Sequence, residues 1–111
     1  MRQKADRLYQ QRYTKKYPKC EACGQPSYCI HHWIYKSHSN FLRWKEENGV
    51  GICKKCHFLI HNVPDSPVRS AILKKRGLEW DLELQEKRNN YFKMNKSSIL
   101  TVIDELNEEE T

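Results

Sequence analysis

Apolar residues follow a helical period near both ends of the chain. Residues 2–16 place Leu8, Tyr9 and Tyr13 at helical spacing and contain no glycine or proline, so they predict a helix that ends before Pro18. A second stripe, behind the capping candidates Ser97 and Ser98, consists of Ile99, Leu100, Ile103 and Leu106. This stripe could dock on the rest of the domain or join two copies in a homodimer.

The middle of the chain predicts short strands and one helix. Residues 28–35 combine aromatic and β-branched side chains, which favour a strand. Gly49 and Gly51 flank a second short strand, and residues 53–62 predict a helix directly after it. The strands are too short and too few to form a core by themselves, so we expect helices to cover them.

Two more helices are predicted farther along. Asp65 and Ser66 offer an N-cap before Pro67 at the first helical position, and Gly77 ends that helix. Residues 79–94 predict a second, highly charged helix. The sequence therefore predicts an α+β fold in which short strands are enclosed by helices.

The size of the chain limits how much core it can bury. It has 111 residues, 38% of them apolar, and a mean hydropathy of −0.93. A single domain this small commonly needs a staple such as a structural metal. We divide it into a basic N-terminal helix (residues 1–17), a core rich in cysteine and histidine (18–63) and C-terminal helices with an acidic tail (64–111).

The apolar segments and the first residues of the chain indicate where in the cell the protein is expected. No segment approaches the ~20 apolar residues needed to cross a bilayer. The first residues are polar and charged and do not resemble a signal peptide. We therefore expect a cytoplasmic protein with no membrane partner.

Charge is unevenly distributed along the chain. The net charge is +6, yet five of the 14 acidic residues lie within residues 97–111, so the body is more basic than this total. A basic body favours a nucleic-acid partner, here duplex or branched DNA. The candidate phosphate contacts are Lys36 and Arg43, between the two strands, and Arg7 and Arg12, on the first helix. That helix could equally be an ordinary solvated face.

Two Cys-x-x-Cys pairs supply four sulfur ligands. Cys20 with Cys23 and Cys53 with Cys56 each have the spacing that lets one tight turn aim two sulfurs at a single ion, which predicts a Cys₄ structural zinc site. A reducing compartment favours such thiolates over disulfides. Cys29 lies outside both pairs, and we interpret it as an ordinary buried strand residue.

Four of the five histidines form a second set of candidate ligands. His57 and His61 are four residues apart, so they share one face of the predicted helix in an arrangement that commonly chelates divalent ions. His31 and His32 are adjacent on the predicted strand and point to opposite faces of it. One of them could join the metal while the other faces a substrate or is buried.

A run of motifs within residues 18–63 resembles the HNH endonuclease family in its zinc-stapled ββα-metal form, namely His31-His32-Trp33-Ile34, Asn48 and Cys53-x-x-Cys56-His57-x-x-x-His61. Asn48 stands nine residues before His57, as the central asparagine does in that family. The resemblance implies a ββα-metal (His-Me finger) core flanked by N- and C-terminal helices. It also implies a metal-dependent endonuclease that hydrolyses DNA phosphodiester bonds.

The resemblance further implies a role for each of five residues. His31, His57 and His61 would bind a catalytic divalent ion, which could be Mg²⁺, Mn²⁺, Ni²⁺ or Zn²⁺. His32 would be the general base that activates water, and Asn48 would hold the loop that positions His32. A neutral imidazole with a pKa of about 6.5 suits that task at neutral pH.

Three further stretches are similar to the lambdoid phage NinG recombination nucleases, namely residues 4–9, 42–48 and 75–79. This similarity favours DNA processing or recombination in a phage or prophage, with a phage protein as another candidate partner. Two alternatives remain open. One is a non-catalytic zinc module that binds nucleic acid or protein, and the other is a structural phage component that holds only one ion.

Overall fold

A computed structural model describes residues 1–108 and shows a small mixed α+β fold. Its elements are α1 (Arg2–Lys16), β1 (Cys29–His32), a 3₁₀ turn (Glu46–Asn48), β2 (Gly49–Ile52), α2 (Lys54–Asn62), α3 (Val68–Arg76), α4 (Leu78–Lys87) and α5 (Lys96–Asn107). The α+β class predicted from the sequence is therefore confirmed. The last part of the predicted acidic tail, residues 109–111, lies outside the described residues.

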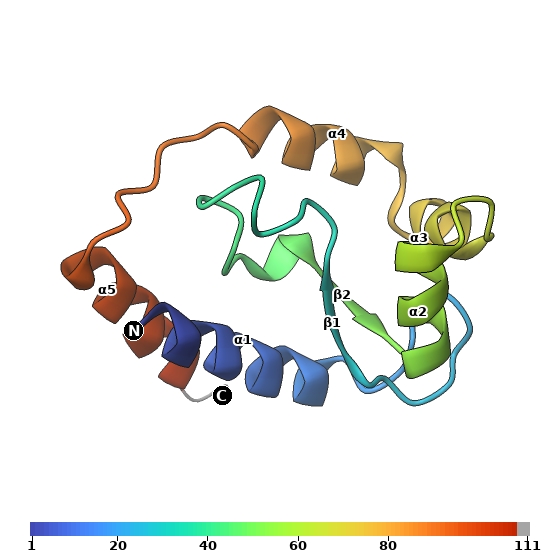
Figure 1. The fold of residues 1–111 in the computed structure, drawn as a ribbon, viewed down its shortest axis with the longest axis horizontal. Helices are drawn as coiled ribbons and strands as arrows, with labels where there is room; N and C mark the ends of the chain where they lie inside the picture. The colour runs from blue at the N-terminus through green and yellow to red at the C-terminus, as the bar shows by residue number, and fades with distance from the viewer. Residues whose placement is uncertain (109–111) are drawn as a thin grey trace.

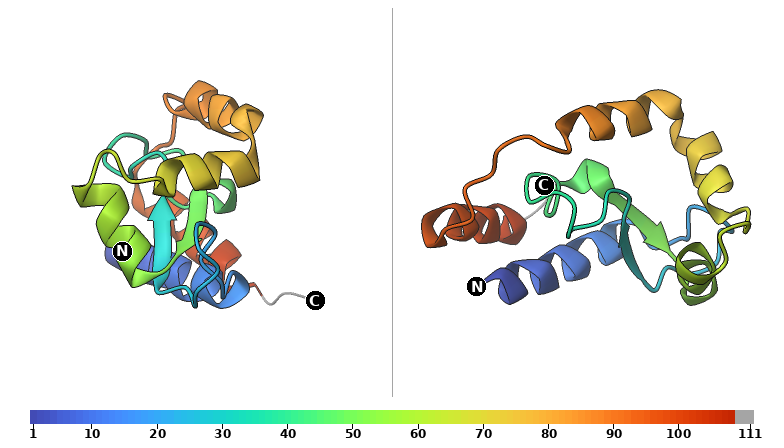
Figure 2. Two further views of the ribbon diagram at one scale, coloured as in Figure 1. Left: turned by 90° about the vertical axis from the view of Figure 1, so that its right-hand side faces the viewer. Right: turned by 45° about the horizontal axis from the view of Figure 1, so that its top comes forward.

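The helices surround the two-stranded sheet and the long loop between its strands (Figure 1). α1 and α5 lie side by side along one edge, α2 and α3 lie at one end, and α4 lies across from α1. Residues 88–95 return the chain from α4 to α5, past the loop of residues 33–48 (Figure 2). No helix among the described residues has both the length and the apolar character needed to cross a membrane.

The sheet register decides which way each residue of β1 faces. β1 pairs antiparallel with β2, with Cys29 opposite Ile52 and His32 opposite Gly49. Because side chains alternate along a strand, Cys29 and His31 share one face while His32 lies on the other. The outer edge of β1 is also held, because the amide of Gln10 both donates to the carbonyl oxygen of Ile30 (2.9 Å) and accepts from its N–H (2.8 Å).

Two apolar clusters meet at the loop of residues 33–48. The first joins the sheet to α2, α3 and α4 and includes Trp33, Leu42, Val50, Ile72 and Leu84. The second joins α1 to α5 and includes Tyr9, Tyr13, Trp44, Ile99 and Ile103. The loop contributes residues to both clusters, so it is a packed part of the core and its backbone can place functional groups accurately.

The C-terminal apolar stripe docks within the chain. Ile99, Ile103 and Leu106 are buried in the cluster with α1, and only Leu100 is left exposed. Arg12 completes this contact, because its guanidinium donates to the last carbonyl oxygens of α5 and just beyond, those of Glu105, Leu106 and Glu108. Docking on the domain, the first of the two interpretations of this stripe, is therefore confirmed.

Two predicted boundaries differ from the structure. The strand predicted over residues 28–35 ends at His32, because Trp33 and Ile34 turn away to bond Asn48. The helix predicted over 79–94 ends at Lys87, and Phe92 and Met94 instead pack on the cluster of α1 and α5. Long-range packing overrides local preference in both segments.

The helix caps also differ. α3 begins after Pro67 without a side-chain cap, so neither Asp65 nor Ser66 has the predicted capping role. α5 is capped by Asn95, whose side chain accepts a hydrogen bond from the N–H of Ser98 (2.8 Å). The predicted caps, Ser97 and Ser98, therefore lie two and three residues beyond the actual N-cap.

Candidate metal centres

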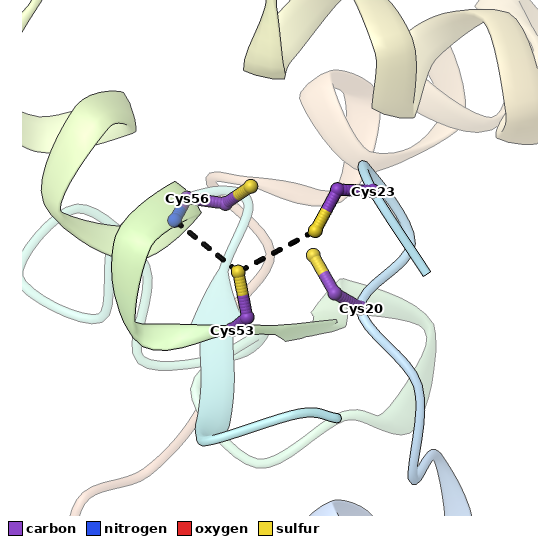
Figure 3. Close-up of side chains that lie close together, drawn as sticks. All are labelled: Cys20, Cys23, Cys53 and Cys56. Carbon is purple, nitrogen blue, oxygen red and sulfur yellow. Dashed lines mark hydrogen bonds between the residues drawn. The ribbon is translucent and has the colours of Figure 1, made fainter. Parts of the chain in front are cut away.

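Four cysteines from two turns converge on one point (Figure 3). Cys20 and Cys23 come from the turn after α1, whereas Cys53 and Cys56 come from the start of α2. Their sulfur atoms all lie within 4.8 Å of one another, so the cluster could hold a metal ion such as zinc. The prediction that these four residues come together is confirmed.

The sulfur geometry fits a shared ion better than a covalent bond. The Sγ atoms of Cys23 and Cys53 are 3.6 Å apart, and all five cysteines are free thiols. A disulfide would need about 2.05 Å. Two sulfurs on a tetrahedral zinc, each at about 2.3 Å, would be separated by roughly 3.8 Å. The observed spacing is close to that value.

The local backbone prepares one sulfur of this cluster for a cation. Burial raises the pKa of the Cys20 thiol, but hydrogen bonds from the backbone N–H groups of Cys53, Cys23 and Ala22 outweigh it and bring the pKa to about 7. The thiolate is the metal-ligating form of cysteine. At Cys20, the backbone of the two cysteine turns therefore stabilises the thiolate form that a cation would bind.

A second cluster contains three imidazoles. His31 comes from β1, and His57 and His61 come from successive turns of α2. Their ligand nitrogens lie within 4.8 Å of one another, and the Nε2 atoms of His57 and His61 are 3.1 Å apart. Two nitrogens on one tetrahedral zinc, each at about 2.0–2.1 Å, would be separated by roughly 3.3 Å. These three histidines could therefore also hold a metal ion.

His31 lacks a hydrogen-bond partner at one ring nitrogen. The residue is only 2% exposed, and its Nε2 atom is buried without a hydrogen bond. Burial, followed by the neighbouring charges of His61 and His57, lowers the pKa of His31 to about 3. Buried polar atoms nearly always have a partner, and a neutral imidazole nitrogen is the form that ligates metals. The orphaned atom is thus well suited to a metal ligand.

His32 occupies the other face of β1. Its Nε2 atom lies 2.9 Å from the backbone carbonyl oxygen of Arg43, and its ring stacks on Tyr9 with centroids 5.0 Å apart. A carbonyl oxygen can only accept, so Nε2 carries the proton in the neutral ring and the lone pair resides on Nδ1. Burial lowers the pKa of His32, which keeps the ring neutral at pH 7.

Asn48 ties the ends of the 33–48 loop together. Its side chain is fully buried, and Oδ1 accepts a hydrogen bond from the N–H of Ile34 (2.8 Å) while Nδ2 donates to the carbonyl oxygen of Ile34 (2.9 Å). The Asn48 carbonyl oxygen also accepts from the N–H of Trp33 (2.9 Å). These bonds hold the segment directly after His32, so Asn48 lies where it can fix the position of that imidazole.

All four of these histidines line one cleft of about 480 Å³. The cleft lies between β1, α2 and the start of the 33–48 loop, and its other lining residues are Gln10, Tyr28, Cys29, Ile30, Tyr35, Lys36 and Ser37. None of these described lining residues is acidic. The thiolate cluster borders a different hollow, so the two candidate metal sites are separate.

The four residues predicted to contact phosphates differ in their exposure and in their partners. The guanidinium of Arg43 is 15% exposed and donates to both carboxylate oxygens of Asp6 (3.0 and 2.6 Å). Arg12 contacts the end of α5, so both of these arginines already bind groups of the chain itself. Arg7 is exposed on α1, and Lys36 is exposed at the rim of the cleft. Arg7 and Lys36 are thus the two exposed members of the predicted set, and Lys36 also pairs with Asp6 (Nζ to Oδ2, 3.9 Å).

Cys29 is a feature of the site that the sequence reasoning missed. It was interpreted as an ordinary buried strand residue, yet it is only half-buried and lines the cleft. Its Sγ atom lies 3.6 Å from Nδ1 of His57. If Nε2 of His57 ligates an ion, Nδ1 of the neutral ring carries the proton. The Cys29 sulfur can then accept a hydrogen bond from this N–H group. The signal was the spacing of two residues between Cys29 and His31, which puts both on one strand face.

Replacing Cys29 should weaken metal binding at the histidine cluster. Loss of an outer partner of a ligating histidine typically lowers metal affinity about 10- to 100-fold, and we expect the lower end for Cys29→Ala because sulfur is a weak acceptor. Cys29→Ser, which keeps an acceptor, should stay close to wild type. Calorimetric titration with Mn²⁺, on protein loaded with one equivalent of zinc per chain, measures both variants. Equal affinities for wild type and Cys29→Ala would show that Cys29 does not orient His57.

No protein-family model, curated protein or solved structure matches this chain. The functional argument therefore depends on the geometry of the two ligand clusters and of the cleft that contains the histidines.

Proposed function

We propose that the protein is a metal-dependent endonuclease that hydrolyses DNA phosphodiester bonds on a ββα-metal core. The observation that carries this proposal is the cluster of His31, His57 and His61 at an open cleft, apart from the four cysteines. A module that only needed a folding staple would have no use for a second ligand set. The sequence similarity described above favours a role in phage or prophage DNA processing or recombination.

The two clusters would divide the work. Cys20, Cys23, Cys53 and Cys56 would hold a structural zinc that joins the turn after α1 to the start of α2. His31, His57 and His61 would hold a catalytic divalent ion. When bound, that ion would stabilise the negative charge that develops on the scissile phosphate and its leaving oxygen. Three protein ligands leave coordination positions open, as catalytic sites require.

His32 is the proposed general base. The hydrogen bond to the Arg43 carbonyl fixes its tautomer, so Nδ1 is the atom able to take a proton from water. Its lowered pKa keeps it neutral and ready at pH 7. Asn48 acts as a positioning residue, because its bonds to Trp33 and Ile34 hold the backbone next to His32. His32, which would activate the water, thus lies on the face of β1 opposite to that of the ligand candidate His31.

The remaining surface supports a polyanionic substrate. The chain carries 20 lysine and arginine residues against 14 acidic ones, and the described lining of the cleft has Lys36 and no carboxylate. Such binding is made largely through phosphates, so it should weaken steeply as salt is added.

Nicking of a supercoiled plasmid tests the proposal. Zinc-loaded protein should nick the plasmid when Mg²⁺, Mn²⁺ or Ni²⁺ is added, and His32→Ala should reduce the rate by about 10²- to 10⁴-fold, the usual contribution of a general base. Tyr91→Ala is the control, because Tyr91 is 81% exposed between α4 and α5 and lies outside the described lining of the cleft, and it should retain activity. Nicking that survives both chelation and loss of His32 would exclude this mechanism. No cutting of either the plasmid or a single-stranded DNA under any condition, together with DNA binding, would favour the non-catalytic module instead.

A further inference from the structure

Two exposed aromatic rings line the histidine cleft. Tyr28 is 61% exposed and Tyr35 is 36% exposed. Tyr35 lies against the histidine cluster, with its ring centroid 5.8 Å from that of His31 and 5.6 Å from that of His61, and its ring also stacks on that of His38 (5.5 Å). Single exposed apolar residues are common on proteins, but two rings in one small cleft favour a ligand with flat faces.

Tyr28 connects the cleft to a second hollow along α1. This hollow is lined by Gln10, Gln11, Thr14, Lys15, Tyr28 and Cys29, so it shares three residues with the cleft. The two hollows therefore adjoin each other between the histidines and α1. Their described linings contain Lys15 and Lys36 but no acidic residue, although Lys36 also pairs with Asp6 (Nζ to Oδ2, 3.9 Å). Lys54 lies over the Tyr28 ring at 5.8 Å.

We propose that the substrate of this site is single-stranded DNA, bound with unpaired bases stacked on Tyr28 and Tyr35 and with its phosphates beside Lys15 and Lys36. This inference rests on the proposed nuclease function and specifies its substrate. A base on the Tyr35 ring would lie directly beside His31 and His61. The backbone of that nucleotide would then pass close to the candidate catalytic ion.

Unpaired rather than paired bases fit these rings. Stacking on an aromatic side chain requires a free base face, and in a duplex both faces of each internal base are covered by its neighbours. Single-strand binding proteins combine the same two features, a positive groove and aromatic platforms, and each stacked base contributes about 1–3 kcal/mol. A duplex held only through its phosphates would give these rings no partner.

Fluorescence anisotropy with labelled DNA tests the inference. Zinc-loaded His32→Ala protein, used so that the DNA is not cut, is titrated with a mixed-sequence single strand and with the same sequence as a duplex at one salt concentration. We expect the single strand to bind at least about ten-fold more tightly. Tyr28→Ala in this background should weaken single-strand binding by roughly 5- to 100-fold and leave duplex binding nearly unchanged.

Tyr91→Ala is the matched control for Tyr28→Ala. Tyr91 is 81% exposed in the segment between α4 and α5 and lies outside the described lining of both hollows, so its loss should not affect either affinity. Equal affinity for duplex and single strand, or equal effects of Tyr28→Ala and Tyr91→Ala, would overturn the inference.

The outcomes also separate this inference from the nuclease proposal. His32-dependent plasmid nicking without a single-strand preference would preserve the nuclease and reject the substrate assigned here. Tyr28-dependent single-strand binding without any cutting would reject the nuclease and leave the binding surface supported. Each proposal can therefore fail while the other stands.

Discussion

Replacing Cys56 with serine should unfold most of the chain. The four cysteines join the turn after α1 to the start of α2, and no disulfide supports that junction among the described residues. A structural zinc supplies about 10–16 kcal/mol of apparent binding free energy, whereas a whole domain is stable by only about 5–15 kcal/mol. We expect the loss of one of four thiolates to remove more zinc-binding free energy than the free energy of unfolding of the whole domain. Circular dichroism and thermal denaturation measure the loss.

Cys29→Ser is the matched control for Cys56→Ser. Cys29 is half-buried and lies outside the four-sulfur cluster, so its replacement by the same residue should leave the melting temperature close to wild type. A chelator strong enough to remove zinc should reproduce the Cys56→Ser result in the wild-type chain. A Cys56→Ser protein that melts like wild type would show that the cysteines do not staple the fold.

The sequence was most informative where geometry is local. A Cys-x-x-Cys turn aims both sulfurs the same way in any fold that permits it, and histidines four apart share a helix face wherever the helix forms. The convergence of four cysteines, and of His57 with His61, followed from those spacings. The placement of His31 and His32 on opposite faces followed from strand alternation in the same way.

Contacts between residues far apart in the sequence could not be predicted in this way. Nothing local predicts that Asp6, on α1, would bind Arg43, because the pair depends on how α1 packs against the 33–48 loop. The same packing takes Arg43 away from the surface where a phosphate contact was expected. The early end of α4 has a similar cause, since Phe92 and Met94 gain burial near α1 only if the helix stops at Lys87.

The role of Cys29 shows a limit of another kind. Strand alternation put Cys29 on the same face as His31, yet a lone cysteine in a strand is usually just buried. Only the position of α2 relative to β1 reveals that its sulfur lies 3.6 Å from the His57 ring. A residue that hydrogen-bonds a metal ligand is often not predictable from the sequence, because the contact depends on how closely two secondary-structure elements pack.

Replacing His57 with alanine should abolish DNA cutting while the protein stays folded. His57 is only partly buried and belongs to the imidazole cluster alone, so the thiolate cluster remains complete. Loss of the second ion would remove several kcal/mol of transition-state stabilisation, which lowers the nicking rate by on the order of 10³-fold. Tyr91→Ala, which replaces an exposed residue outside the cluster and the cleft, should cut as wild type does and should melt at the same temperature.

The central claim is that sulfur and imidazole ligands hold two different ions, and the number of ions bound per chain tests it most directly. Protein loaded with one equivalent of zinc per chain, which the four thiolates bind first, is saturated with Mn²⁺, freed of unbound metal by gel filtration and analysed for both elements. We predict one zinc and one manganese per chain for wild type, and one zinc with no manganese for His57→Ala. A wild-type chain that holds a single ion, or a His57→Ala chain that still holds two, would contradict the account.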